Sequence, residues 1–218
     1  MTTRHAYDQG LEMLRKEIIL MGELVARAIG DAVTSLAQKD VELARKVMEG
    51  DDAIDALEVS IEDRCMLLIA KQQPMARDLR IISTGLKITT DLERMGDHAY
   101  DIAKVTLLLA NEPLIKPLID IPRMAQMVEK MLNQAMEAYT NMDITLAEQV
   151  CLADDEVDQL QRQMFRELLT FMLEDPKKIG QATQLILVGR FLERFADHAT
   201  NIAEWVIYLV TGQRLRKK

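Results

Sequence analysis

Glycine, proline and aromatic residues are scarce in this chain of 218 residues, and cysteine occurs only twice. Nine glycines and five prolines are too few for a collagenous, low-complexity or turn-rich protein. Aromatic residues make up 4% of the chain, whereas leucine, alanine, methionine and glutamate are abundant. This balance favours helices over strands and predicts an all-α protein.

Disulfides, a secretory signal and membrane-spanning segments are also not expected. Cys65 and Cys151 each stand among apolar neighbours, which predicts reduced core thiols and a cytoplasmic location. A charged amphipathic stretch follows the first residues where a signal peptide would have an apolar region. No apolar run approaches the roughly 20 residues that cross a bilayer, so no transmembrane segment is predicted.

Basic residues are outnumbered by acidic ones, 27 to 35, which gives a net charge of −8. Proteins that bind nucleic acid normally carry the opposite bias, so no nucleic-acid partner is expected. The sequence also lacks nucleotide-binding glycine loops, the zinc-protease and α/β-hydrolase motifs, and the Glu-x-x-His pattern of di-iron bundles. No catalytic residue is predicted, because no nucleophile stands in a recognisable pattern with a base.

Helical periodicity runs through nearly the whole chain. Apolar residues recur at spacings of three and four, first over residues 11–36 and then from 43 onwards. Asp40 is predicted to cap the second helix, and Pro74 to end it. The segment 111–122 contains three prolines and is the best candidate for a linker.

The second half of the chain repeats the first. Segments 92–103 and 192–203 are identical at eight of twelve positions, and upstream segments match at an offset of 103. The sequence therefore predicts two tandem, pseudo-symmetric three-helix bundles, six helices in all. The expected domains are residues 1–112 and 118–218.

Acidic residues form two stripes in each half. A spacing of i, i+4 and i+8 places them on one flank of an apolar helix face. If each hairpin turns at its proline, the two stripes of a half lie at the same height and face each other. The predicted metal ligands are Asp51, Asp55, Glu93, Asp97 and Asp101 in the first half, and Asp154, Asp158, Glu193, Asp197 and Asn201 in the second.

Facing rows of carboxylates need something to offset their repulsion, because even a solvated like-charge pair at i, i+4 costs about 0.2–0.5 kcal/mol. Water, arginine or lysine partners, or bound metal could each do so. Oxygen donors, with His98 and His198 off the stripes, would select hard cations such as Mg²⁺, Mn²⁺ or Ca²⁺, or iron. A solvated acidic face is the alternative, and the repetition in both halves favours metal.

Three segments resemble the PhoU family. They are KQQPMARDLR at 71–80, LERMGDHA at 92–99 and LERFADHA at 192–199, and the resemblance covers essentially the whole chain. The paired E/D-x-x-x-D motifs of that family match Glu93–Asp97–Asp101 and Glu193–Asp197. Asn201 replaces the third acid of the second motif, which weakens that ligand set.

The resemblance implies helical bundles that bind several metal ions (Mg, Mn or Fe) on their surfaces, and a homodimer. It also implies a negative regulator of the phosphate-starvation response that modulates phosphate uptake. Such a regulator acts between the phosphate ABC transporter, through its ATPase PstB, and the sensor histidine kinase PhoR. These partners would recruit a cytoplasmic protein to the inner face of the membrane.

An enzyme with a carboxylate-bridged metal cluster, acting as a hydrolase or in redox chemistry, is the competing interpretation. Metal-assisted catalysis requires an enclosed pocket with an open coordination position. The predicted stripes flank the apolar core and face solvent, which favours a binding protein over an enzyme.

Overall fold

The computed structural model describes residues 3–72 and 74–214. This part of the chain forms six long α-helices and one short 3₁₀ helix, with no strand, so the all-α prediction is confirmed. The elements are α1 (Thr3–Gln38), α2 (Val41–Gln72), α3 (Arg77–Leu109), α4 (Asp120–Asn141), α5 (Ile144–Glu174), η1 (Pro176–Lys178) and α6 (Ile179–Thr211).

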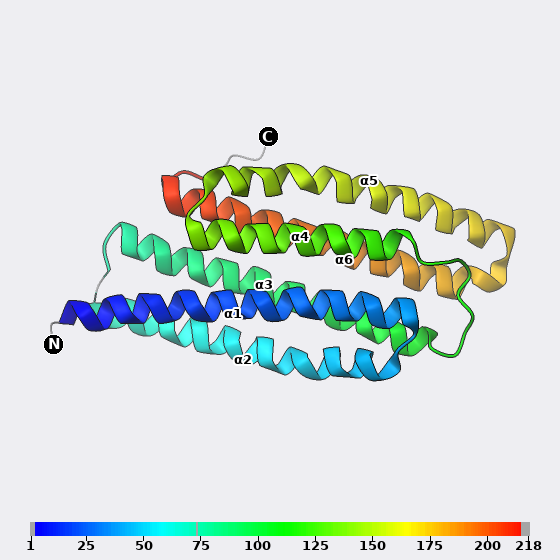
Figure 1. Cartoon of the computed structure of the whole chain (residues 1–218), viewed down its shortest axis with the longest axis horizontal. Helices are drawn as coiled ribbons and strands as arrows, with labels where there is room; N and C mark the ends of the chain where they lie inside the picture. Colours follow the sequence, from blue (N-terminus) through cyan, green and yellow to red (C-terminus); the bar gives the residue numbers. More distant parts are fainter. Residues whose placement is uncertain (1–2, 73, 215–218) are drawn as a thin grey trace.

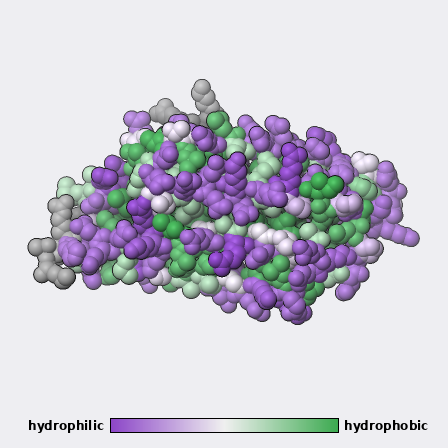
Figure 2. Space-filling model, in the orientation of Figure 1, coloured by the Kyte–Doolittle hydropathy of each residue, from purple (hydrophilic) through white to green (hydrophobic). Residues whose placement is uncertain are grey.

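The helices form two three-helix bundles that lie side by side, α1–α3 and α4–α6 (Figure 1). The bundles join where α3 packs along α6 and α1 along α4, and both of these pairs run in opposite directions. Helices α2 and α5 therefore lie at the outer edges, each packed only on its own bundle. The predicted pair of tandem three-helix bundles is confirmed. Figure 2 shows that hydrophilic side chains cover most of the face in view, with apolar groups between them.

Equivalent positions of the two halves fill the core. Leu92 and Ile102 of α3 are fully buried, as are their counterparts Leu192 and Ile202 of α6. Burying a side chain of this size contributes about 1.5–3 kcal/mol. Because the two bundles share one continuous apolar core, the flanks of α3 and α6 are held in fixed orientations.

The junctions before α2 and α5 repeat one backbone design. The side chains of Asp40 and Asp143 accept hydrogen bonds from Leu43 N (2.9 Å) and Leu146 N (3.1 Å), which confirms the predicted cap at Asp40. The residue before each cap is left-handed, with φ 56° at Lys39 and 55° at Met142. The repeat seen in the sequence thus extends to the backbone of the turns.

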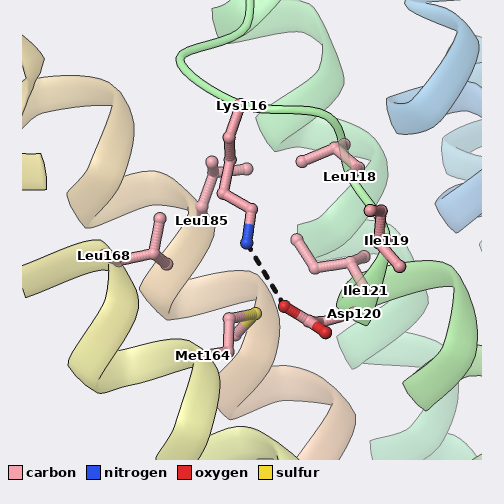
Figure 3. Close-up of a pocket in the computed structure, with 8 residues that line it drawn as sticks. All are labelled: Lys116, Leu118, Ile119, Asp120, Ile121, Met164, Leu168 and Leu185. Carbon is pink, nitrogen blue, oxygen red and sulfur yellow. Dashed lines mark hydrogen bonds and ion pairs between the residues drawn. The ribbon is translucent and has the colours of Figure 1, made fainter.

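The linker is fixed to the second bundle by a partly buried lysine (Figure 3). Lys116 contacts Asp120 at 3.2 Å and also pairs with Glu167 of α5, while Gln181 of α6 accepts a hydrogen bond from Ile115 N. The cavity beside this lysine has a volume of about 10 Å³, room for a single water and not for a ligand.

Helix α4 begins at Asp120, inside the segment 111–122 that is predicted to be a linker. The reason is that Pro122 lies in the first turn, where a helix needs no backbone N–H and the fixed φ of proline is compatible. The linker between the bundles is correspondingly shorter than the segment 111–122 predicted from its prolines.

Replacing Met142 with glycine should raise the free energy of unfolding by about 0.5–1 kcal/mol, because glycine adopts a left-handed φ without a Cβ clash. Thermal or urea unfolding measures the change. Met142→Ala keeps the Cβ and is the matched control. Equal stability of the glycine and alanine variants would contradict the strain argument.

Candidate metal centre

The first acidic groove lies between α2 and α3, which approach closely at Gly96. A Cβ built on Gly96 would lie 3.1 Å from Oδ1 of Asp51 and 3.2 Å from Cδ1 of Ile54. The absence of a side chain at this position therefore brings the Asp51 carboxylate against the backbone of α3, next to Asp97. This agrees with the expectation that the two stripes of each half lie at the same height and face each other.

The electrostatics of this groove show that the two stripes face each other. Burial, followed by the charges of Asp55, Asp97 and Glu93, raises the pKa of Asp51 from 3.8 to about 6. The pKa of Glu93 is also raised by burial, with contributions from Asp97 and, across the groove, from Glu58 and Asp55. Charges from α2 and α3 thus act on one another along the groove.

The second groove, between α5 and α6, repeats the arrangement. Burial, followed by the charges of Asp197 and Asp158, raises the pKa of Asp154 from 3.8 to about 6. Burial also raises the pKa of Glu193, against the opposing charges of two arginines on α6, and Asp158 adds to the rise. The facing stripes predicted from the repeat are therefore present in both halves.

The last predicted ligand on α3, Asp101, and the one at the matching position of α6, Asn201, have different surroundings. In the first half, burial raises the pKa of Asp101, which lies near the charges of Lys104 and Asp97. In the second half, the Asn201 amide donates a hydrogen bond of 3.2 Å to Asp91 of α3. The amide group of Asn201 is thus engaged at the junction of the bundles, and its role as a ligand stays a prediction.

The two histidines lie at the α3–α6 junction, with their ring centroids 5.7 Å apart. His198 Nδ1 contacts Asp91 at 2.8 Å, whereas His98 stacks on Phe191 at 5.8 Å between ring centroids. Burial, with a contribution from His198, lowers the pKa of His98 to about 4, so this ring is neutral at pH 7.

Two residues that contact predicted ligands, Asp91 and Arg190, escape the sequence analysis. Asp91 is buried between the bundles. The one feature of the sequence that could have pointed to it is a difference between the repeats, since the matching position of the second half is Phe191. Arg190 pairs with Glu193 at 2.5 Å, and its signal is a basic residue within one turn of a predicted ligand. Neither residue belongs to the repeated motif, so the repeat alone does not identify them.

The donor set fits a hard cation in chemistry, with carboxylate oxygens on facing helices and no thiolate. Oε2 of Glu193 is buried without a hydrogen-bond partner, and it forms an ion pair with Arg194 Nε at 4.0 Å. Among the described residues, no three histidine, cysteine or acidic side chains already surround one point. Binding an ion would therefore require these side chains to turn inward across the groove.

These features define a class: a pair of pseudo-symmetric three-helix bundles, each with an acidic groove between its second and third helices. The family model described as the PhoU domain matches the chain twice, over residues 18–106 and 121–206. The chain belongs to the PhoU family.

Relatives and solved structures agree with this assignment. The chain is 47% identical to a protein of Aquifex aeolicus, over 93% of this chain and 92% of that one. It is 40% identical to one of Clostridium acetobutylicum, over 98% of each. Both relatives are named phosphate-specific transport system accessory protein PhoU homolog.

Two crystal structures share the fold. PhoU from Pseudomonas aeruginosa superimposes with a TM-score of 0.92 at 38% identity, covering 95% of this chain and all of that one. The phosphate transport system regulatory protein PhoU from Streptococcus pneumoniae gives 0.89 at 31% identity, covering 97% of this chain and all of that one.

As the pH falls from 7.5 to 5.5, the Tm of the chelator-treated protein should rise relative to that of the double variant Asp51→Asn/Asp154→Asn. The folded-state pKa of Asp51 and Asp154, about 6, lies above the ordinary 3.8, so these two groups bind more protons in the native state in this window. His98, whose pKa is lowered to about 4, has the opposite effect, and it acts equally in both proteins. Solvent screening of the partly exposed aspartates limits the relative rise in Tm to roughly 2–5 °C.

Calorimetric melts at a series of pH values measure this rise. The double variant should melt higher than the parent at pH 7.5, and this difference should shrink toward pH 5.5. A difference in Tm that stays constant over this range would show that the carboxylates do not repel one another in the folded protein.

Proposed function

We propose that this protein is a metal-binding regulatory accessory protein of a phosphate transport system. The observation that carries the metal-binding part is the pair of carboxylate stripes facing each other in both hairpins. Asp51 with Asp97, and Asp154 with Asp197, would form the centre of each site, where burial and mutual repulsion raise the pKa of Asp51 and Asp154. A bound Mg²⁺, Mn²⁺ or iron ion would supply the positive charge that this arrangement lacks.

The remaining residues of each groove position the donors. Glu93 and Glu193 lie one turn before the central aspartates of α3 and α6, with side chains 16% and 15% exposed. Most of the surface of these two side chains is therefore shielded from solvent. An ion held between the two helices of a hairpin would fix α2 on α3 and α5 on α6.

The regulatory part of the proposal rests on the relatives, whose names describe accessory and regulatory proteins of phosphate transport. In this scheme the protein acts as a cytoplasmic homodimer that restrains the phosphate-starvation response. It contacts the ATPase PstB of the phosphate transporter and the sensor histidine kinase PhoR. Long helical faces offer surfaces for such contacts, and none of the helices within 3–72 and 74–214 has the length and hydropathy to cross a lipid bilayer.

The double variant Glu93→Gln/Asp97→Asn should bind Mn²⁺ at least about tenfold more weakly at the first site, because it removes two of the facing charges. Isothermal titration with Mn²⁺ measures the affinity and stoichiometry. The metal-free variant should melt no lower than the metal-free parent, since the repulsion is relieved.

The matched control is Asp52→Asn/Asp155→Asn, which removes the same charge from the exposed side of α2 and α5. This control should retain nearly all Mn²⁺ binding. Unchanged uptake by the Glu93/Asp97 variant would remove these two residues from the site.

Cells that lack the protein should express a phosphate-starvation reporter in phosphate-rich medium, and the parent gene should restore repression. The variant Asp51→Asn/Asp97→Asn/Asp154→Asn/Asp197→Asn should fail to restore it at equal protein level if metal is needed for regulation. A pull-down of PstB and PhoR with and without Mn²⁺ tests the contacts directly. Full repression by this variant would separate regulation from the acidic grooves.

A further inference from the structure

The two grooves differ in charge although their backbones repeat. Position by position, Glu58 of the first groove becomes Gln161, and Asp101 becomes Asn201. In the other direction, two uncharged positions of the first half become arginines in the second. These changes are Val59 to Arg162 and Thr90 to Arg190.

The added arginines bind the predicted ligands of the second groove. Arg162 Nη1 lies 3.4 Å from Asp158 Oδ2, and Arg190 Nη1 lies 2.5 Å from Glu193 Oε1. The first groove has no counterpart of these two pairs, because Val59 is an exposed apolar residue and the Thr90 hydroxyl donates to a backbone carbonyl of its own helix.

One arginine is common to both grooves and does not distinguish them. Arg94 Nη1 lies 3.0 Å from Asp97 Oδ2, and Arg194 Nη1 lies 3.4 Å from Asp197 Oδ2. Lys104, which lies near Asp101, becomes Glu204 in the second half. Counted over all these positions, the first groove has six carboxylates against two basic residues, and the second has five against three.

We propose that the two sites are unequal: the first groove binds multivalent cations strongly, and the arginines of the second groove partly take the place of the cation there. This inference rests on the proposed metal-binding function and assigns a different affinity to each half. In the first groove, Arg94 offsets part of the charge on Glu93 and Asp97, and most of the repulsion is left for an ion from solution to relieve. In the second, Arg162 and Arg190 already neutralise part of the charge, so an incoming ion gains less and must compete with them.

The difference should be measurable because each site can be tested alone. Glu193→Gln/Asp197→Asn leaves only the first site intact, and Glu93→Gln/Asp97→Asn leaves only the second. In titrations at 0.15 M salt, the first site should bind Mn²⁺ about tenfold more tightly than the second. Two exposed ion pairs acting against a divalent ion account for a change of about this size.

Exchanging the residues between the halves gives the matched control. In the protein that keeps only the second site, Arg162→Val/Arg190→Thr should raise Mn²⁺ affinity about tenfold. In the protein that keeps only the first site, Val59→Arg/Thr90→Arg should lower it by a similar factor. All four positions are exposed, so circular dichroism and Tm should show that the variants fold alike.

Two results would overturn the inference in different ways. Equal affinities at both sites, or exchanges without effect, would refute the inequality while leaving metal binding intact. No Mn²⁺ uptake by the unmodified protein would refute both the inequality and the proposed metal-binding function.

Discussion

Close packing within each hairpin forces carboxylates of like charge to share one narrow groove. The apolar face of α3 fixes the direction in which its flank points, and Gly96 lets α2 approach until Asp51 lies against the backbone of α3. Because the shared core holds both helices, the carboxylates cannot separate without disturbing it. Burial and the facing charges raise the pKa of Asp51 here, and they do the same for Asp154 in the second groove, where Ala196 replaces the glycine.

Any positive charge that enters such a groove reduces the repulsion between its carboxylates. This effect links the fold to the proposed function. A soluble ion, a proton or an arginine can each relieve the repulsion, and the two halves combine these means differently. The same charge that makes a groove bind a cation also makes its hairpin sensitive to the cation's presence. An accessory protein of phosphate transport, as the relatives are named, could use that sensitivity on the faces of α2 and α5.

Much of this architecture could be predicted from the sequence because the chain repeats itself. The match between 92–103 and 192–203 predicted the two bundles. Helical geometry predicted that the stripe with Asp51 faces the stripe with Asp97. What could not be predicted depends on contacts between the halves, which have no counterpart within one repeat. The hydrogen bonds of Asp91 to His198 and Asn201 are of this kind, since only the antiparallel packing of α3 on α6 brings them together. The start of α4 inside the predicted linker depends on a proline that a helix accepts only in its first turn.

The junction between α3 and α6 makes the two halves complementary. Asp91 of one half accepts bonds from the other, while Phe191 at the matching position offers His98 an aromatic face. In a chain built from two first halves, each Asp91 would meet an aspartate where Asn201 now donates, and the two carboxylates would repel. In a chain built from two second halves, phenylalanine would replace Asp91, so the imidazole and the amide would lose their acceptor. Each half is therefore matched to the other at this junction, and a pair of identical halves would be less stable in this geometry.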